Sequence, residues 1–448
     1  MGDVKPEDYD NEGFWREHDE QKPVVRKTDS ALWLEAVEEA EFFKTLSKPV
    51  KQNYEQFTYI GSGSFGMVFR AMREGKQYAV KLFFDKKSGY LEAIREVSVL
   101  LYLKKLAMQN CLASTPHGHA EPNDSLHCCP DNIICYTDHF RARLDSELAL
   151  FMTSKVNFEI DLKYEFYFIE SKFLSGNTIH DVIKARMFNA QKQIREHMRT
   201  QRTKENLEEG VFYSPQSEEI REVYTKFGPT KEQNLSMMHT ALVALEFMHR
   251  HGAFHRDIHT ANIILLNKES ERPESVLLDV GTSCVKNECV DLIGHGAYGL
   301  HRLANEARIL LAAHTLETSK NQTEIYTAQH VLMMAGILKR NLEPVKTMSQ
   351  GRLSRLVEAA IDVYALGTVF YYYLSGIFPR WTDDFEPRKR PSKEKPGANS
   401  EMWELVEDMI NIDIPLRETA ARAKQRAFDM LSAETSRKTQ ARASRVES

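Results

Sequence analysis

The chain has 448 residues, of which 42% are hydrophobic and 27% are charged, and its formal net charge is -5. This balance is typical of a globular protein, and the length allows one two-lobed enzyme or two to three domains. So small a net charge excludes a bulk electrostatic attraction to nucleic acid or to an anionic membrane surface.

The chain shows no sign of a membrane span or of a secretory signal. No stretch approaches the roughly 20 apolar residues that a span requires. The N-terminus is acidic and polar and has no apolar signal-peptide core. Six cysteines in so long a chain do not make a disulfide framework. We therefore expect an intracellular, cytoplasmic protein in a reducing compartment, with the nucleus or a host cell as alternatives.

Residues 1–52 are predicted to form an N-terminal arm and an amphipathic helix. Residues 1–28 are rich in Asp, Glu and Lys, which indicates a flexible arm. Residues 30–47 carry apolar side chains at helical spacing, and Ser30 is the candidate N-cap. The simpler interpretation is a helix packed on the domain that follows. The alternative is a helix that regulates the protein or binds a partner.

A glycine-rich stretch follows, directly before two predicted strands. Residues 61–68 read Gly-Ser-Gly-Ser-Phe-Gly-Met-Val, and the second strand covers residues 77–84, including Lys81, after a Glu74-Gly75 turn. Two strands joined by a hairpin differ from the strand-to-helix entry of a dinucleotide-binding fold. Glycines let the backbone approach phosphate groups closely and donate N–H groups without side-chain clashes. We therefore expect a phosphate-binding hairpin.

A helix is predicted from about Leu91 to Leu106, with Glu96 in its middle and Glu92 one turn earlier. The loop over residues 107–131 then concentrates potential zinc ligands, which are Cys111, His117, His119, His127, Cys128 and Cys129. Their spacing contains no C-x-x-C pair, so a long surface insert is the preferred interpretation and a zinc site is the alternative.

Residues 165–177 are predicted to form a strand and a connecting hinge. A helix from Thr178 to about Met187 comes next, and a charged insert that is low in apolar residues covers positions 188–229. A further helix begins near Thr230, where Thr230 and Gln233 have the spacing of a capping box.

Polar residues then cluster at the ends of two predicted strands. Asp257 and Asn262 lie on a loop between a helix and a strand, and Asp279 follows the next strand. Loops held by rigid elements can expose reactive groups in fixed positions. Mg²⁺ favours a few carboxylates together with phosphate oxygens, which suits this sparse set. The three residues therefore predict a Mg²⁺–phosphate site.

These stretches resemble motifs of the eukaryotic-type protein kinase family, in the family's order, over about residues 53–430. The family's catalytic loop H-R-D-L-x-x-x-N reads His-Arg-Asp-Ile-His-Thr-Ala-Asn at 255–262, and its D-F-G motif reads Asp-Val-Gly at 279–281. The glycine motif G-x-G-x-x-G-x-V is complete at 61–68, and the run ending at Lys81 matches V-A-I-K.

The resemblance implies an α+β, bilobal fold with a small antiparallel-sheet N-lobe at 53–173 and a larger helical C-lobe at 174–433. The C-lobe would carry inserts near 188–229 and 307–355, and a disordered tail would follow at 434–448. The implied activity is an ATP- and Mg²⁺-dependent transfer of the γ-phosphoryl group to Ser or Thr hydroxyls of a protein substrate.

The resemblance also implies a role for each matching residue. Asp257 would accept or orient the substrate hydroxyl proton, and Asn262 and Asp279 would hold the metal ions. Lys81 would contact the α- and β-phosphates and pair with Glu96. The residues expected to bind the nucleotide are Ile60, Gly61, Ser62, Gly63, Ser64, Phe65, Gly66, Val68, Ala79, Lys81, Lys172 and Leu174. The adenine contacts would come from the backbone of residues 172–174.

Two residues of the predicted C-lobe would support the catalytic loop and the segment after Gly281. Asp362, on a predicted helix, would receive backbone hydrogen bonds from the catalytic loop. Arg417 would pair with Glu306 at the end of the activation segment.

Departures from the family pattern leave two alternatives. His259 replaces the lysine usual in Ser/Thr kinases and would act on the transferring phosphoryl group, and Val280 replaces Phe in the D-F-G motif. His259 also resembles the H-x-D-x-H loop of aminoglycoside- or choline-type phosphotransferases, whereas Asp362 and Arg417 favour a protein kinase. A pseudokinase scaffold is the second alternative, against which the intact metal and lysine residues argue.

Overall fold

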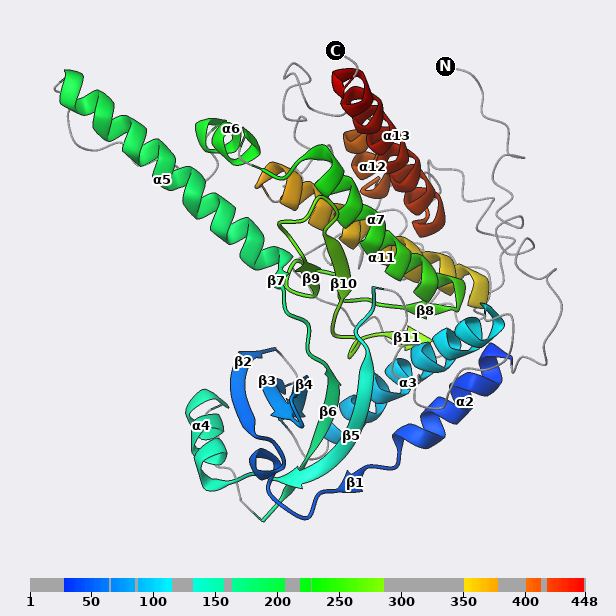
Figure 1. Cartoon of the computed structure of the whole chain (residues 1–448). Coiled ribbons are helices and arrows are strands. Elements are labelled where there is room, and N and C mark those ends of the chain that lie inside the picture. The colour runs from blue at the N-terminus through cyan, green and yellow to red at the C-terminus, as the bar shows by residue number, and fades with distance from the viewer. Residues whose placement is uncertain are drawn as a thin grey trace, which may run out of the picture.

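The computed structural model describes residues 28–63, 66–84, 88–114, 132–156, 163–205, 218–226, 228–285, 350–377, 400–411 and 417–446. Over these ranges the protein is mixed α+β, with a six-stranded sheet in the N-terminal part and mainly helices beyond it (Figure 1). Among these residues, no helix combines the length and the apolar character that crossing a bilayer requires.

The six-stranded sheet has the order β1-β5-β6-β4-β3-β2. Its strands are β1 (Lys44–Thr45), β2 (Gln56–Ser62), β3 (Gly66–Arg73), β4 (Lys76–Phe83), β5 (Tyr136–Arg143) and β6 (Glu165–Lys172). All pairs are antiparallel except β1 with β5. The predicted hairpin is confirmed, because β3 and β4 are joined at Glu74 and Gly75, which both have positive φ.

Alternation along the strands sends side chains to two faces of this sheet. Phe69 and Ala71 of β3, with Val80 and Leu82 of β4, enter one apolar core that helix α4 (Ser146–Val156) covers. Because successive side chains point to opposite faces, Lys81 projects away from that core. Helix α3 (Ser88–Ser114) packs on β4, β5 and β6.

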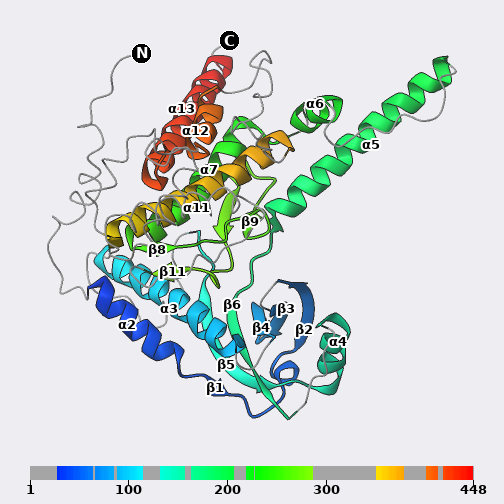
Figure 2. The same ribbon diagram turned by 180° about the vertical axis from the view of Figure 1, so that it is seen from behind.

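Two N-terminal helices differ from their predicted bounds. Helix α2 spans Asp29–Ala40, and Thr28 caps it by accepting the Ala31 N–H, whereas the sequence indicated residues 30–47 with Ser30 as the cap. Residues 44–45 instead join the sheet as β1, because β5 offers them backbone partners. Helix α3 is longer than the predicted 91–106, and α2 runs alongside it (Figure 2).

The C-terminal part is built mainly from helices. They are α5 (Ile179–Glu205), α6 (Glu218–Lys226), α7 (Lys231–Arg250), α11 (Gln350–Ser375), α12 (Ser400–Met409) and α13 (Ala420–Val446). Two small sheets accompany them, with strands β7 (Asn177–Thr178), β9 (Ile263–Leu266), β10 (Glu274–Leu277), β8 (Ala253–Phe254) and β11 (Cys284–Val285). The expectation of a short helix after Thr178 was wrong, because α5 continues to Glu205.

The predicted disordered tail was also wrong for most of its length, because α13 continues to Val446. This helix packs along α7 through the fully buried Ala423 and Ala427. Lys424 lies 3.1 Å from Glu246 and Lys438 lies 2.5 Å from Glu232, so ion pairs to α7 flank the apolar contact. A charged sequence thus becomes helical because a partner surface receives its small side chains.

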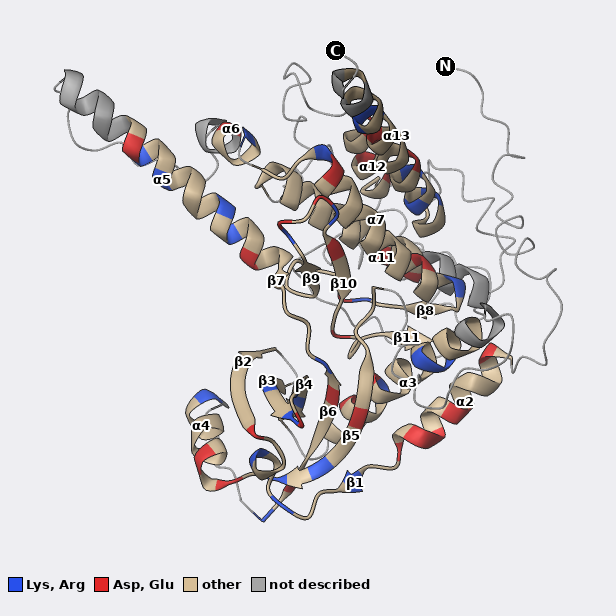
Figure 3. Cartoon of the chain, in the orientation of Figure 1, with Lys and Arg blue, Asp and Glu red and all other residues tan. Residues whose placement is uncertain are grey.

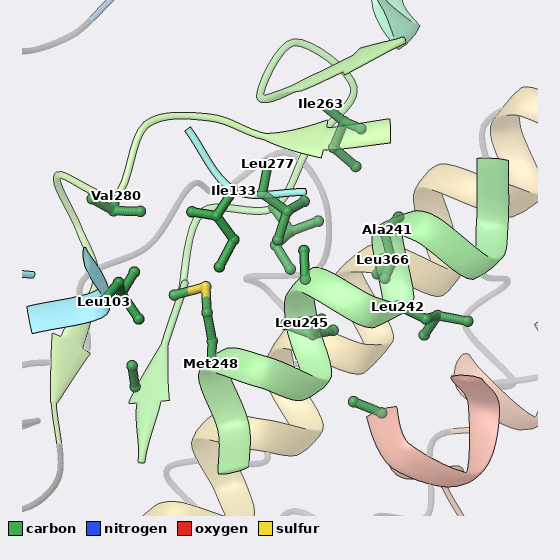
Figure 4. Close-up of a cluster of buried hydrophobic side chains, with 14 of the residues drawn as sticks. Leu103, Ile133, Ala241, Leu242, Leu245, Met248, Ile263, Leu277, Val280 and Leu366 are labelled. Atoms are coloured by element: carbon green, nitrogen blue, oxygen red, sulfur yellow. The ribbon is translucent and has the colours of Figure 1, made fainter. Parts of the chain in front are cut away.

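A single apolar cluster joins α7 to its neighbours and fixes the site loops. Figure 4 shows Leu245 and Met248 of α7 facing Ile133 and Leu277, with Leu366 of α11 on the same cluster. Strands β9 and β10 pair antiparallel, with Ile263 opposite Leu277. The loops that leave these strands are therefore anchored in the core at both ends.

Two buried cysteines, Cys135 and Cys284, are disulfide-bonded. The sequence indicated only that the six cysteines make no disulfide framework. The sequence thus did not predict this bond, and the reducing compartment stays a prediction.

The capping box at the start of α7 generates a stability prediction. The Thr230 hydroxyl accepts the Gln233 N–H at 3.3 Å, and the Thr230 N–H donates to Gln233 Oε1 at 2.8 Å. Thr230→Ala removes the first bond and should lower the free energy of unfolding by about 0.5–2 kcal/mol. Thr230→Ser keeps the hydroxyl and should change it little. Urea unfolding of both variants tests this, and equal losses in the two would contradict it.

Candidate active site

A buried carboxylate holds the backbone of the loop that begins at His255. Asp362 of α11 is 0% exposed, and it accepts the N–H of His255 at 2.7 Å and the N–H of Arg256 at 2.7 Å. His249 Nε2 lies 2.9 Å from the same carboxylate. These bonds confirm the predicted contact, and they support Arg256 in its strained left-handed conformation, φ 65°.

Arg256 has a buried partner that the sequence did not indicate. Its Nε lies 3.2 Å from Glu358 Oε2 of α11, and both side chains are 5% exposed. Burial raises the pKa of Glu358 to about 7, although Arg256 opposes that shift. Glu358 precedes Asp362 by one helical turn, so the two carboxylates occupy one face of α11. The four-residue separation of Glu358 and Asp362 is the sequence feature from which the Arg256–Glu358 pair could have been predicted.

Asp257, Asn262 and His259 lie together on the loop. Asn262 Nδ2 donates to the Asp257 carbonyl at 3.0 Å and to Asp257 Oδ2 at 3.1 Å. His259 Nε2 lies 3.7 Å from the same Oδ2. The Ala261 N–H donates to His259 Nδ1 at 3.2 Å, so the neutral imidazole carries its proton on Nε2, the nitrogen nearer Asp257.

Lys81 connects three separate elements. Its Nζ donates at 2.7 Å to Glu96 Oε2 of α3 and at 2.7 Å to Asp279 Oδ1, which follows β10. The predicted pair with Glu96, rather than with Glu92, is thus present. The Lys81 side chain is 13% exposed, the Glu96 side chain 6% and the Asp279 side chain 35%, so Asp279 is the most open of the three to solvent.

The three charges perturb one another's ionisation. Burial raises the pKa of Glu96 to about 7, against the lowering effect of Lys81. Burial disfavours the Lys81 ammonium, but the two carboxylates outweigh this effect and raise its pKa. The pKa of Asp279 is lowered because Lys81 outweighs the effect of burial. The cluster therefore favours an ionised Lys81–Asp279 pair, with Glu96 as the group that takes up a proton.

Gly281 lies against this close group of charges. Its N–H donates to Asp279 Oδ1 at 3.2 Å, and Asp279 has a positive φ of 53°. A Cβ added at Gly281 would lie 2.9 Å from Glu96 Oε2, which no ordinary contact allows. Val280, between the two, is fully buried near Leu103 and Ile133 (Figure 4). The turn at 279–281 is therefore held in place by the burial of Val280 and by the ion pair of Asp279 with Lys81.

Hydrogen bonds join the loop of Asp257 to the turn of Asp279. His255 Nε2 lies 2.9 Å from the Leu278 carbonyl, and the Leu278 N–H donates to the Asn262 carbonyl at 2.8 Å. The hydroxyls of Thr282 and Ser283 donate to the His255 carbonyl at 3.2 Å and 3.1 Å. The three predicted metal and catalytic positions are thus held on adjoining segments.

The available oxygen donors fit Mg²⁺. Asp279 Oδ1 is used by Lys81 and Gly281, which leaves Oδ2 for a metal. Asn262 donates through Nδ2, which leaves its amide oxygen as a ligand. In the described part of the chain, no three or more His, Cys, Asp and Glu residues are grouped to hold a metal. A sparse site of this kind suits Mg²⁺ shared with phosphate oxygens.

Gly63 and Gly66, the described ends of the glycine loop, are hydrogen-bonded to each other. The Gly63 N–H donates to the Gly66 carbonyl at 2.9 Å. A Cβ at Gly66 would lie 2.1 Å from the Leu82 carbonyl oxygen, whereas one at Gly61 or Gly63 would meet nothing within 4 Å. Gly66 is thus needed for strand pairing, and the two earlier glycines leave open space above the backbone.

The remaining predicted nucleotide contacts lie on the sheet or next to it. Ile60, Ser62, Val68 and Ala79 belong to β2, β3 and β4, and Lys172 ends β6. The Lys172 N–H donates to the Cys135 carbonyl at 2.9 Å, and the Phe173 N–H donates to the Gln77 carbonyl at 3.3 Å. Two of the three backbone N–H groups in the predicted adenine-contacting stretch 172–174 are thus used within the protein.

Several predicted residues fall outside the described ranges. They are Ser64, Phe65, Glu306 and the zinc candidates at 117–129, and the side chain of Cys111 belongs with them. Arg417 is described, and it donates to the carbonyls of Asn411 at 2.7 Å and Ala360 at 2.8 Å. Its guanidinium also lies 5.0 Å from the Tyr364 ring centroid.

No protein-family model matches the chain, and a comparison with curated proteins finds no match either.

The raised pKa of Glu96 generates a pH prediction. Between pH 4.5, the ordinary pKa of the group, and about pH 7, the folded protein holds a proton on Glu96 that the unfolded chain releases. The stability that this proton adds to the folded protein is complete below pH 4.5 and is lost as pH rises through about 7. The unfolding free energy of the wild type, relative to Glu96→Gln, should therefore fall over this range by up to about 1.4 kcal/mol per pH unit. Urea unfolding across pH tests it, and a rising difference would contradict it.

Proposed function

We propose that the protein is an ATP- and Mg²⁺-dependent protein kinase that phosphorylates Ser or Thr hydroxyls of protein substrates. The observation that carries the proposal is the assembly of Lys81, Glu96 and Asp279 beside the loop of Asp257 and Asn262. These residues come from elements far apart in sequence, and only this fold brings them together.

The proposal includes a bilobal arrangement. The six-stranded sheet with α3 would be the smaller lobe, and the helices from α5 onward would be the larger one. ATP would lie between them, with its phosphates under the β2–β3 hairpin and its adenine near the Leu174 N–H. An intracellular location, where ATP is plentiful, belongs to the same proposal.

Asp257 is suited to the substrate hydroxyl. Its Oδ2 accepts a hydrogen bond from Asn262, whereas its buried Oδ1 has no hydrogen-bond partner within the described residues. An unsatisfied buried carboxylate oxygen is costly unless a ligand supplies the donor. The Ser or Thr hydroxyl would be that donor, and Asp257 would orient it toward the γ-phosphorus and take up its proton. The new O–P bond would form as the bond between the γ-phosphorus and the bridging oxygen breaks, and ADP would leave with that oxygen.

The other residues hold charge in place during transfer. Lys81, fixed by Glu96, would bind the α- and β-phosphates, and Asp279 and Asn262 would hold Mg²⁺, which neutralises charge on the phosphate oxygens. His259 would present its Nε2 proton to the transferring group. Catalysis would then depend on positioning and on fixed charges rather than on a covalent intermediate.

A small-molecule phosphotransferase is the second candidate, favoured by one observation. His259 Nε2 lies 3.7 Å from Asp257 Oδ2, so the histidine of the H-x-D-x-H pattern does face the catalytic carboxylate. Asp362 supports the protein kinase instead, because it is buried and accepts two successive backbone N–H groups of the loop, as the kinase resemblance implies.

The test is a radiolabelled-ATP assay on the full chain with Mg²⁺. Generic protein substrates and a panel of aminoglycosides and choline are supplied in parallel, and Asp257→Asn is the inactive control. Label on Ser or Thr of protein supports the proposal. Label on phosphotyrosine alone refutes the Ser/Thr specificity. Label on a small molecule alone favours the second candidate, and no transfer in any arm points to a pseudokinase scaffold.

Lys81→Met is expected to abolish phosphoryl transfer while leaving the fold in place. The substitution removes the ammonium between two carboxylates, and Glu96 can then be neutralised by taking up a proton. The melting temperature should stay close to that of the wild type. Lys76→Met, at the exposed start of the same strand, is the matched control and should keep full activity. Retained turnover in Lys81→Met would remove this lysine from the mechanism.

His259→Ala is expected to lower kcat by on the order of a hundred- to a thousandfold, the usual loss for one positioned donor. The KM for ATP should change little. His259→Lys keeps an N–H donor at this position and should retain substantial activity. Steady-state kinetics measure both. Near-wild-type turnover in the alanine variant would show that the imidazole takes no part in transfer.

A further inference from the structure

Helix α2 and strand β1 contain none of the proposed catalytic residues, yet α2 packs on α3, the helix that carries Glu96 (Figure 2), and β1 pairs with β5. The apolar side of this segment is buried, through Leu32, Trp33, Ala36, Ala40 and Phe43. The face that the sequence offered to a partner is therefore covered by the protein's own α3.

The first anchor lies at the C-terminal half of α3. The rings of Trp33 and Tyr102 meet edge to face, with centroids 5.6 Å apart. The Tyr102 hydroxyl donates to the His251 carbonyl at 2.8 Å, and His251 Nδ1 lies 3.5 Å from Asp29 Oδ2. His251 caps the C-terminus of α7, just before the loop of Asp257. Helix α2, helix α3 and the approach to the catalytic loop thus meet at one junction.

The second anchor lies at the N-terminal end of α3. Phe43 packs against Tyr90 of α3 with ring centroids 6.3 Å apart, and edge to face against Tyr167 of β6 at 5.0 Å. The Leu46 N–H donates to the Arg141 carbonyl at 2.8 Å, which extends the pairing of β1 with β5. This end of α3 is therefore tied to the sheet.

Glu96 lies midway between Tyr90 and Tyr102, the two anchored residues of α3. A third contact joins the same two helices, because Lys105 Nζ lies 2.7 Å from Glu39 Oε2, and Figure 3 shows acidic residues along α2 beside basic residues of α3. A helix held at both ends can neither rotate nor slide without breaking these contacts. The Lys81–Glu96 distance of 2.7 Å is set by that same placement.

We propose that residues 28–46 act as a built-in clamp that positions α3, and through it Glu96, for the phosphoryl-transfer reaction. Trp33 and Phe43 are its positioning residues. The clamp lets the chain assemble the Lys81–Glu96 pair without a separate partner protein. The inference rests on the proposed function for its catalytic consequence, but not for its structural one.

The kinetic test is a double-mutant cycle in the full chain. Trp33→Ala should lower kcat on the order of ten- to hundredfold, because small displacements of a positioned group have effects of this size. In a Glu96→Gln background the same change should lower kcat by less than about twofold, since no glutamate is left to position. Trp33→Phe should restore most activity. Leu34→Ala, on the same helix but at a side chain 62% exposed, is the matched control and should leave kcat unchanged.

Hydrogen exchange without nucleotide gives a readout independent of turnover. Amides of residues 92–100 should exchange at least about tenfold faster in Trp33→Ala, with residues 235–245 of α7 unchanged. Tyr102→Phe preserves core volume and should shift the same amides in the same direction, which keeps the test available if Trp33→Ala does not fold. Unchanged exchange in α3, or equal kcat losses in both backgrounds of the cycle, overturns the clamp. Faster exchange in a protein that transfers no phosphoryl group overturns only the proposed function.

Discussion

The Lys81 ammonium lies between the carboxylates of Glu96 and Asp279, and the arrangement of the protein around the site follows from that contact. Removing such charges from water is costly, and the pairing of Lys81 with both carboxylates offsets that cost in the folded protein. A strand, a helix and a turn after a distant strand must therefore be positioned together. A Cβ at Gly281 would lie 2.9 Å from Glu96 Oε2, so a larger residue there would displace the end of the Glu96 side chain.

A second buried carboxylate, that of Asp362, fixes the backbone of the loop that begins at His255. Asp362 binds two successive N–H groups of the loop, and Glu358 neutralises Arg256 from the same helix. Side chains thus fix α3 against the sheet, while backbone bonds fix the loop of Asp257 against α11. Reactive groups need this kind of surrounding support, because a loop without it would not hold catalytic distances.

The contacts that fix α3 and the contacts that fix the loop of Asp257 come together at the junction of α2, α3 and the end of α7. His251 lies at the end of α7, and its carbonyl accepts the Tyr102 hydroxyl of α3. The orientation of α3 and the start of the loop are therefore linked through one short path. Helix α2 contacts this path through Trp33 and Tyr102, so the N-terminal helix can affect the proposed reaction although it holds none of the proposed catalytic residues.

Local sequence determined the hairpin of β3 and β4, the start of α7 and the composition of the site motifs. Strand alternation, the capping box of Thr230 and the glycines act over a few residues, so their outcome can be inferred without the fold. The pairing of Lys81 with Glu96 and the contact of Asp362 with its loop were also inferred, through resemblance to a family in which those positions are spatially defined.

Only the tertiary structure decided the rest. The Arg256–Glu358 pair, the strand β1, the end of α2 and the helical tail to Val446 each depend on a partner distant in sequence. Residues 44–45 became a strand because β5 presented an open edge, and α13 became a helix because α7 offered it an apolar and acidic surface. Local propensity is weak beside such contacts, since burial and ion pairing outweigh the few tenths of a kcal/mol that separate most residues in helix preference.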